Sequence, residues 1–497
     1  MTVTCQQMQQ LEEAAFDRGV SAEALMDEAG RGIADVVRQF CPKPGLLVLY
    51  LGKGNNAGDA LVAARELRTD GWRIAARLGS EPTQMKPLPL MHWRALENVA
   101  LTEVEATLAP HRGPLVLLDG LLGIGAKGPL RDSMRAMAAE MNELRRTCHA
   151  TTIAMDIPSG VDGDSGQSCA DAVIADITVT IAQVKQGLLA DEATAHVGRL
   201  ALVPLRELKA DAPGPEIITS SLLRPLLPKR NFEMHKGQAG RVALIAGSPG
   251  FLGTAVLASL GALRGGAGLI TLLVKPEAYD LLAMKLPPEI MVKRCEDYRE
   301  AMTGYEVLAI GPGIGFEHET EVMELVRNTR QPMVVDADAL TILARHHLQD
   351  LMAAQGLRLL TPHPGEMNRL QGKDASQQPA SRLMQAEAFA NSAWTSQVTL
   401  LLKGARTVIA TAQHRTRYNA TGTPGMACGG MGDVLSGLCA ALIAQGLSLH
   451  DAASAGSWLL GRAAEAALSY RSEEALSATD VAEHLGQAFN DLKHGAY

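Results

Sequence analysis

Short apolar runs alternate with helix-like segments along most of this 497-residue chain, which restricts it to folds built on parallel β-sheets. The helices predicted in the first half are Gln7–Asp17, Ala22–Gln39, Asp59–Thr69 and Asp132–Arg146. The predicted strands are Leu46–Leu51, Arg73–Leu78, Leu115–Leu118, Thr152–Met155 and Ile177–Ile181. The first half is therefore predicted to be an α/β domain with a parallel, doubly wound sheet.

A stretch rich in proline and charge interrupts the alternation between about Leu208 and Pro228. Such segments are typical of linkers. A second alternating series then opens, and its predicted strands are Arg241–Ala246, Val307–Ile310, Leu357–Leu360 and Val398–Leu402. The sequence thus predicts two α/β domains, residues 1–210 and 229–497, joined by a linker at residues 211–228. Each domain is long enough to bury a core of its own.

A glycine run and one carboxylate stand at the start of a strongly apolar helix in the second half. Gly429 to Gly432 precede Asp433, and apolar residues then recur at helical spacing. The free N–H groups and the positive dipole end of such a helix bind anions. Asp433 could take a proton from a hydroxyl while the amides hold a transferring phosphoryl group. Alone, the pattern is equally consistent with an ordinary helix cap.

Three further loops of the second half follow predicted strands. They are Gly311–Gly315, the T-P-H-P-G-E-M motif at Thr361–Met367 and the K-G-A-x-T motif at Lys403–Thr407. Ligands of open α/β sheets bind just beyond the carboxyl ends of the strands. Together with the run N-x-T-G-x-P-G-M-A-x-G-G-x-G-D-V-L-x-G that ends at Gly437, these motifs resemble the ribokinase-like NAD(P)H-hydrate dehydratases.

The resemblance implies that the second half uses ADP to phosphorylate a hydrated nicotinamide ring and then eliminates phosphate. It makes Asp433 the general base and the amides of Gly430–Gly432 the anion site. The residues that would contact the hydrate are Thr254, Gly313, Gly315, His363 and Asp433. The residues that would contact the nucleotide are Lys403, Gly404, Ala405, Arg406, Thr407 and Gly432. A magnesium ion is expected with the phosphates.

The first half carries polar loops of its own at strand ends. Gly52–Asp59 follows the first strand, but it matches neither the P-loop nor the dinucleotide spacing. Gly123–Gly128 does match G-x-G-x-x-G, but Pro129 interrupts it, so we interpret it as a phosphate-binding or lid loop. Asp119 and Asp156 also stand where strands end. A buried carboxylate there needs a cation, a donor or a substrate, unless it only anchors its turn.

The motifs N-x-x-G-D, D-x-x-x-G-x-G and D-I-P-S-G-V-D are similar to those of the Rossmann-like NAD(P)H-hydrate epimerases. Their order ahead of a dehydratase-like half resembles the fused bacterial repair enzymes. The resemblance implies that this half interconverts the R and S forms of hydrated NADH and NADPH. The residues that would hold the hydrate are Asn55, Asn56, Ala57, Gly58, Asp59, Gly123, Ile124, Gly125, Ala126, Lys127, Gly128, Pro129 and Asp156.

The same resemblance assigns two roles within the first half. Asn56, Asp119 and Ser159 would bind a potassium ion. Asp156 would be the general acid/base, because epimerisation at the ring hydroxyl needs a proton shuttle, and Lys127 would be its partner on the loop.

The chain departs from the family patterns at four positions. Met431 stands where Thr is usual, Cys428 where Thr or Ser is common, and Ala57 and Ala60 replace glycines. If the anion site is built from main-chain amides, Met431 in place of Thr has little effect on anion binding. The two alanines make close backbone approach of a ligand less assured. None of these changes removes a carboxylate.

Other functions remain open at this point. The second half could be a small-molecule kinase with the first half as its nucleotide sensor, since a fold does not determine a substrate. T-P-H-P-G-E-M argues against a simple kinase. A pure interaction scaffold would leave the polar loops at the strand ends unexplained.

Composition and charge exclude several classes of partner. The net charge of −8 gives no basic surface for nucleic acid, and no run is apolar enough to span a membrane. A cytoplasmic location is therefore expected, and we also expect a homo-oligomer. Seven scattered cysteines without a C-x-x-C pair indicate neither a disulfide framework nor a zinc site.

Overall fold

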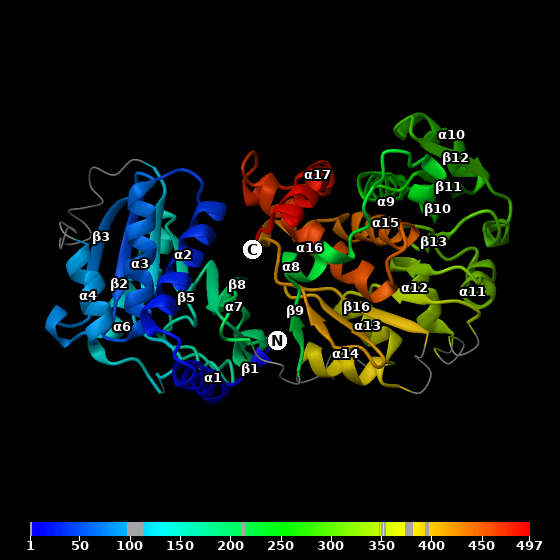
Figure 1. The fold of residues 1–497 in the computed structure, drawn as a ribbon. Helices are drawn as coiled ribbons and strands as arrows, with labels where there is room; N and C mark the ends of the chain where they lie inside the picture. Colours follow the sequence, from blue (N-terminus) through cyan, green and yellow to red (C-terminus); the bar gives the residue numbers. More distant parts are fainter. Residues whose placement is uncertain are drawn as a thin grey trace. The chain divides into compact units, whose positions relative to one another are not determined.

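The computed structural model describes residues 2–96, 113–126, 128–209, 214–346, 348, 351, 354–372, 381–392 and 397–497. The chain falls into two compact units, Met1–Gly214 with Tyr497, and Pro215–Ala496. Both units combine helices with parallel strands (Figure 1). In the described parts of the chain, no helix is both long and apolar enough to cross a lipid bilayer.

The first unit is built on a parallel sheet of six strands in the order β3-β2-β4-β5-β6-β8. These strands are β2 (Leu46–Leu51), β3 (Arg73–Leu78), β4 (Leu115–Gly120), β5 (Thr151–Met155), β6 (Ile177–Ile181) and β8 (Arg199–Val203). The helices are α1 (Cys5–Asp17), α2 (Ala22–Phe40), α3 (Asn55–Thr69), α4 (Pro87–Ala95), α6 (Asp132–Cys148) and α7 (Thr194–Val197).

Alternate side chains of the central strands face opposite layers of helices. Leu47 and Leu49 of β2 belong to one core with residues of α2 and α3. Leu46 and Val48 belong to a second core with residues of α6. Successive side chains of a strand point to opposite faces, so helices cover both faces of this sheet. The prediction of a doubly wound sheet is confirmed.

The strand order reverses beside β2. The chain leaves β2 through α3 to β3 on one side, and later enters β4 on the other side, where Leu51 pairs with Gly120. The loops that follow β2 and β4 diverge at this point, and open α/β sheets bind ligands at such a reversal. The topology therefore places the N-x-x-G-D and D-x-x-x-G-x-G motifs at a natural binding position.

The start of α3 differs from the sequence prediction. The helix expected from Asp59 begins one turn earlier, at Asn55, so residues 55–59 are the first helical turn and not a loop. Asn is a weak helix former, but Ala57 in this turn is fully buried, and tertiary packing overrides weak propensities. A small parallel pair, β1 (Thr2–Val3) with β7 (Val184–Lys185), was not predicted.

The second unit contains a ten-stranded sheet in the order β12-β11-β10-β13-β14-β15-β16-β17-β18-β9. The strands are β9 (Glu216–Ile217), β10 (Arg241–Ile245), β11 (Leu269–Val274), β12 (Ile290–Arg294), β13 (Val307–Ile310), β14 (Met333–Val335), β15 (Arg358–Leu360), β16 (Val398–Leu402), β17 (Val408–Thr411) and β18 (Arg417–Tyr418). Strands from β12 to β16 run parallel, whereas β17 is antiparallel to both neighbours.

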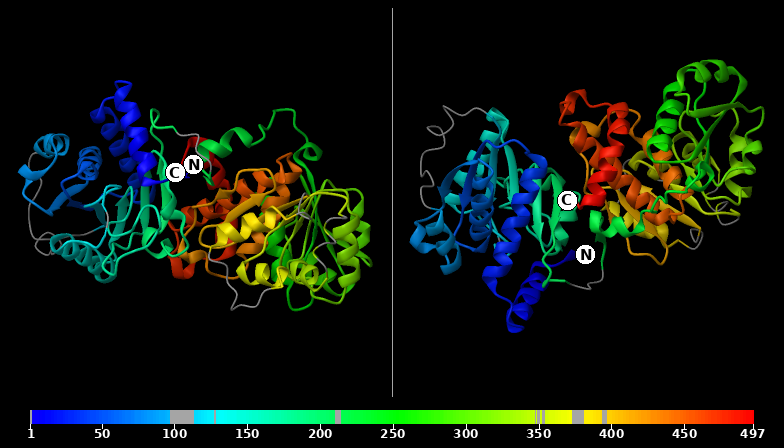
Figure 2. Two further views of the ribbon diagram at one scale, coloured as in Figure 1. Left: turned by 90° about the horizontal axis from the view of Figure 1, so that it is seen from below. Right: turned by 45° about the horizontal axis from the view of Figure 1, so that its top comes forward.

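The helices of the second unit are α8 (Ser220–Leu223), α9 (Leu252–Arg264), α10 (Pro276–Lys285), α11 (Glu319–Asn328), α12 (Ala337–Arg345), α13 (Pro364–Leu370), α14 (Arg382–Ala390), α15 (Met431–Ala444), α16 (Leu449–Ala467) and α17 (Ala478–His494). Helix α15 packs against α9. Helices α16 and α17 also pack against each other, and they lie side by side at the orange to red end of the colour scale (Figure 2). Val434 of α15 and Trp458 of α16 join strand residues such as Leu244 in one core. This packing holds α15 against the sheet.

Much of the predicted linker is folded. Residues 210–213 lie outside the described part of the chain, but Pro215 onward belongs to the second unit. Strand β9 pairs with β18, and Ile218 and Leu223 are buried. Pro225 stands in the first turn of a short 3-10 helix, where a missing N–H costs nothing. Pro225 therefore marks a turn between short elements.

Candidate active sites

The three residues predicted to bind potassium lie together at the carboxyl edge of the first sheet. Asn56 is in the first turn of α3, Asp119 lies near the end of β4, and Ser159 follows β5. Nδ2 of Asn56 donates to the Leu122 carbonyl over 2.7 Å, and the Leu122 N–H donates to Ser159 Oγ over 3.1 Å. Ser159 donates to Asp119 from its Oγ and its N–H, both over 2.7 Å. Leu122 thus links the three side chains.

Asp119 is fully buried, and its partners are neutral. Besides Ser159, the Leu121 N–H donates to its Oδ1 over 3.2 Å. Burial raises the pKa of Asp119 to about 6, although these hydrogen bonds oppose the shift. Among the described residues, no Lys, Arg or His forms an ion pair with it. A buried carboxylate without a counter-charge favours a bound cation.

Asp156 is held by a lysine that the sequence analysis did not single out. Lys185 on β7 is 1% exposed, and its Nζ donates to Asp156 Oδ1 and, over 2.9 Å, to the Ile181 carbonyl. Asp156 is also buried and has a left-handed φ of 64°. Strained backbone of this kind gathers at functional sites. No motif in the sequence marks Lys185, which stands between Val184 and Gln186.

Two further acids surround this pair. Burial, with the charges of Asp156 and Glu12, raises the pKa of Asp59 well above its usual range. Burial and the charge of Asp156 also raise the pKa of Glu12 on α1. Groups with shifted pKa values in one cluster are candidates for proton transfer. The predicted hydrate residue Asp59 thus lies in the electrostatic neighbourhood of the predicted acid/base Asp156.

Of the remaining residues predicted for this site, some are exposed to solvent and others are buried. Gly123 lies beside Asn56, because a Cβ added to the glycine would stand 3.7 Å from the Asn56 Cβ. The exposed members of the loop are Gly125, Ala126, Gly128 and Pro129, with Asn55 exposed on α3 and Ile124 half-buried. Lys127 lies outside the described residues. Ala57 and Gly58 are buried, and a Cβ at Gly58 would collide with Met26, so these two could offer a ligand only backbone groups.

In the second unit, Asp433 stands in the first turn of α15. Gly430 caps the helix with a φ of 92°, and a Cβ there would lie 2.3 Å from a Leu257 methyl carbon, so glycine is required. Burial, then the charge of Asp336, raise the pKa of Asp433 to about 7, although Lys403 opposes the shift. A carboxyl group that titrates near neutrality suits general base catalysis.

Lys403 and Gly432, both predicted to contact nucleotide, are neighbours. A Cβ at Gly432 would lie 3.1 Å from Lys403 Nζ. That Nζ pairs with Asp336 Oδ1 over 2.8 Å, and Ser436 of α15 donates to Asp336 Oδ2 over 2.6 Å. Burial alone would lower the pKa of Lys403, but Asp336 and Glu366 outweigh it and raise the pKa. A fixed cation therefore stands beside the amino end of α15, and helix amino ends are favourable positions for phosphate groups.

The glycine loop after β13 holds the other predicted hydrate contacts. Thr254 donates to the Pro312 carbonyl over 3.1 Å, and a Cβ at Gly313 would collide with the Thr254 hydroxyl. Gly315 has a φ of 71°, and its N–H donates to Asp338 Oδ2 over 3.0 Å. Asp338 is among the charges that act on Asp433. The loop and the start of α15 therefore lie in one site.

His363 caps α13 and is half exposed. Its Nδ1 accepts from the N–H groups of Gly365 and Glu366, while Glu366 accepts from the His363 N–H over 2.8 Å. Burial, with the charge of Lys403, lowers the pKa of His363, which favours the neutral ring. The two capping hydrogen bonds occupy Nδ1 of His363. Its Nε2 lies 3.5 Å from Glu366 Oε1.

The K-G-A-x-T loop is only partly open. Gly404 and Ala405 are exposed, whereas Arg406 is 2% exposed and Thr407 is buried. The Arg406 guanidinium thus points away from solvent, so in this structure the loop offers a nucleotide mainly Lys403 and backbone.

Sequence reasoning missed three acids of this site. Asp336 and Asp338 follow β14 in the run V-V-D-A-D-A-L, and Glu366 lies inside the quoted T-P-H-P-G-E-M motif without a role of its own. A signal did exist, because two carboxylates directly follow a short apolar strand. We did not predict the three-residue strand Met333–Val335, so the sequence analysis did not place the D-x-D pattern at the end of a strand.

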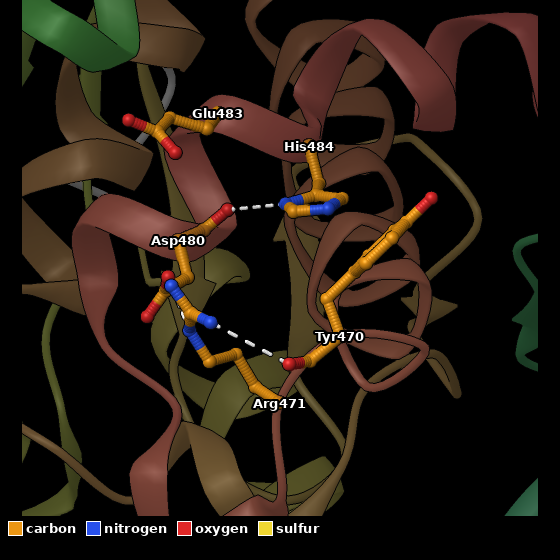
Figure 3. Close-up of a pocket in the computed structure, with 5 residues that line it drawn as sticks. All are labelled: Tyr470, Arg471, Asp480, Glu483 and His484. Atoms are coloured by element: carbon orange, nitrogen blue, oxygen red, sulfur yellow. Dashed lines mark hydrogen bonds and ion pairs between the residues drawn. The ribbon is translucent and has the colours of Figure 1, made fainter.

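A surface hollow of about 440 Å³ lies elsewhere, between the end of α16 and α17. It is lined by Tyr470, Arg471, Asp480, Glu483 and His484 (Figure 3). These side chains are largely engaged with one another, since Arg471 pairs with Asp480 and the Tyr470 and His484 rings stand 5.7 Å apart. None of the predicted site residues lines it.

Comparisons with known proteins cover both units. A family model described as YjeF-related protein N-terminus matches residues 22–187, and one described as NAD(P)H-hydrate dehydratase matches residues 242–487. A bifunctional NAD(P)H-hydrate repair enzyme of Moorella thermoacetica is 35% identical over 99% of this chain and 97% of its own length. One of Coxiella burnetii is 34% identical over 98% of this chain and 99% of its own.

A solved structure resembles the second unit. The ADP/ATP-dependent NAD(P)H-hydrate dehydratase of Bacillus subtilis, co-crystallised with ATP and Mg²⁺, is 29% identical with a TM-score of 0.50. It covers 56% of this chain, and all of its own chain is matched. The similarity confirms the ribokinase-like α/β fold predicted for this unit.

Proposed function

The chain belongs to the family of bifunctional NAD(P)H-hydrate repair enzymes, and we propose that its two units each hold one of the two active sites. The unit of residues 1–214 epimerises R and S hydrates, and the unit of residues 215–496 dehydrates the S form with ADP. One observation carries this division: each unit places an aspartate, Asp156 or Asp433, near a lysine at the carboxyl edge of its own sheet. An alternative kinase with a sensor domain would not need the first of these pairs.

The second unit supports phosphorylation followed by elimination. Asp433 accepts the proton of the C6 hydroxyl while that oxygen attacks the β-phosphorus of ADP and AMP leaves. The amides at the start of α15 and Lys403 stabilise the transferring phosphoryl group. The C6–O bond then breaks, phosphate departs with the electron pair, and loss of a C5 proton restores the ring double bond. The products are NAD(P)H, AMP and phosphate.

The first unit supports proton transfer at the same hydroxyl without nucleotide. In one route the C6 hydroxyl leaves as water, N1 forms a double bond to C6, and water adds to the opposite face. In the other the ring opens at the N1–C6 bond and recloses. Asp156 is proposed as the acid/base in either route, with hydrate held by the first turn of α3 and the Gly123–Pro129 loop.

Both proposed metal ions suit the oxygen atoms present. Asp119 and Ser159 bring a carboxylate and a hydroxyl oxygen together, and Asn56, which donates from Nδ2 to the Leu122 carbonyl, also carries an amide oxygen, so these residue types suit potassium. Among the described residues, no three His, Cys, Asp or Glu side chains gather as a metal site, so neutral oxygens must contribute. Magnesium would be held mainly by the phosphates of the nucleotide and by water, with at most two of the carboxylates near Asp433 as ligands. When bound, magnesium would neutralise phosphate charge.

A direct assay tests the proposal. The full chain is incubated with a mixture of R and S hydrates and either ADP or ATP, and the absorbance of reduced nicotinamide is followed. Complete return of both forms is expected with ADP, whereas a dehydratase alone would stop when the S form is consumed, apart from slow spontaneous epimerisation. No gain over the uncatalysed rate with either nucleotide would overturn the proposal.

The pKa of Asp433 predicts how dehydration depends on pH. A general base must be ionised, so kcat/KM for S hydrate should fall about tenfold per unit below pH 7 and level off above it. The groups that face Asp433 are Asp336, Asp338 and Lys403. The measurement is the rate with saturating ADP between pH 5 and 9, at constant ionic strength. A flat profile through pH 7 would contradict the role of Asp433.

Location and assembly are also proposed. All seven cysteines are free, in keeping with a reducing compartment, and we propose a cytoplasmic enzyme of small-molecule substrates. We further propose a homo-oligomer, for which light scattering on the purified chain is the test.

A further inference from the structure

Lys185 is a buried cation that the reaction described above does not use. Its side chain is 1% exposed, and its Nζ donates to Asp156 Oδ1 and to the Ile181 carbonyl. Removing an ammonium group from water is costly unless an opposite charge and hydrogen bonds compensate. Among the described residues of the first unit, Lys185 is the one buried lysine or arginine, and it lies directly against the proposed acid/base.

The contacts orient the Asp156 carboxylate. Oδ1 accepts from Lys185 and, over 3.2 Å, from the Ile181 N–H, so two donors hold one oxygen. No described residue donates to Oδ2. Strand β7 carries Lys185 and pairs with β1, where Lys185 is aligned with Val3. The amino-terminal strand thus fixes the backbone from which the lysine reaches Asp156.

Several acidic groups surround Lys185 and Asp156, and Lys185 supplies the positive charge among them. The charges of Asp156 and Lys185 both act on Asp59 of α3 and Glu12 of α1, and Cys5 and Asp164 lie in the same neighbourhood. Nearby carboxylates favour protonation of one another, whereas an adjacent ammonium favours the ionised form. Lys185 is the cation that acts on Cys5, Glu12 and Asp59 alike.

We infer that Lys185 is a positioning residue of the epimerase, which holds the Asp156 side chain by Oδ1 and leaves Oδ2 to exchange the proton of the C6 hydroxyl. The inference rests on the proposed epimerase function of the first unit. Lys185 itself need not touch the hydrate.

The test compares Lys185→Met, which removes the charge, with Lys185→Arg, which keeps it, in the full chain. Epimerisation is measured from pure R hydrate without nucleotide, by chromatography of the two forms. We expect Lys185→Met to lower kcat about tenfold to a hundredfold with KM little changed, because a misplaced catalytic group costs on this scale. Lys185→Arg should recover a substantial part of the rate.

A double-mutant cycle separates positioning from simple packing. In an Asp156→Asn background, Lys185→Met should cost little more, because its effect passes through Asp156. Equal losses in both backgrounds would overturn the inference. Lys275→Met is a matched control, since Lys275 is a buried, ion-paired lysine of the other unit and should not affect epimerisation.

Folding is monitored by circular dichroism and by dehydration of S hydrate. If Lys185→Met does not fold, Lys185→Gln replaces it. If neither neutral variant folds while Lys185→Arg does, Lys185 is a structural partner and the inference is wrong. A wild-type chain that dehydrates S hydrate but never converts R hydrate would instead defeat the proposed epimerase function, which is a distinct outcome.

Discussion

Replacing Asp433 by Asn is expected to lower dehydration of S hydrate at least about a hundredfold, the low end of what a general base contributes. Asn keeps the size of the side chain at the start of α15 but cannot accept the C6 proton. The amides proposed to hold the phosphoryl group are unchanged, so nucleotide affinity should remain near that of the wild type. The measurements are kcat with ADP and calorimetric binding of ADP.

Two controls make the Asp433 result specific. Asp280→Asn, at an exposed position on α10, should leave dehydration unchanged. Epimerisation of R hydrate by Asp433→Asn should equal that of the wild type, because the proposed acid/base of that reaction, Asp156, lies in the first unit. A folded Asp433→Asn enzyme with near-normal turnover would remove Asp433 from the proposed reaction.

The sequence predicted the fold well because apolar periodicity reports burial directly. Leu46–Leu51 was predicted to the residue, since every side chain of that strand is buried on one face or the other. Boundaries were less accurate where local preference and packing disagree. Asn55 and Asn56 look like loop residues, yet they begin α3 because the following turn is buried. Such packing depends on residues far away in the sequence.

Candidate site residues were predicted best where a motif stands at a strand end. Asp119, Ser159 and Asn56 do lie together, and so do Lys403, Gly432 and Asp433. Their catalytic and binding roles stay predictions, because proximity alone does not test chemistry.

The missed residues share one physical reason. Lys185 and Asp336 act through partners that are distant in the sequence, Asp156 and Lys403, and each would be costly to bury alone. A single sequence shows the isolated charge but not its partner. The useful signal is a pair of carboxylates directly after a short apolar strand, as at Asp336 and Asp338, because a charge buried there needs a partner that the fold must supply.

Replacing Asp156 by Asn is expected to trap R hydrate, with epimerisation reduced at least about a hundredfold, while dehydration of pure S hydrate stays intact. Asn still accepts a hydrogen bond from Lys185 but cannot shuttle a proton at the C6 hydroxyl. With mixed hydrates and ADP, the absorbance should therefore rise only until the S form is consumed, and then continue at the spontaneous rate.

The Asp156 variant also tests whether the two sites are independent. Asp17→Asn, at the exposed end of α1, is the matched control and should return both hydrates. If Asp156→Asn consumes R hydrate as fast as the wild type, Asp156 is structural and its left-handed backbone serves only the turn. If it also loses dehydration of S hydrate while remaining folded, the second unit depends on the first, and separate active sites cannot account for the repair.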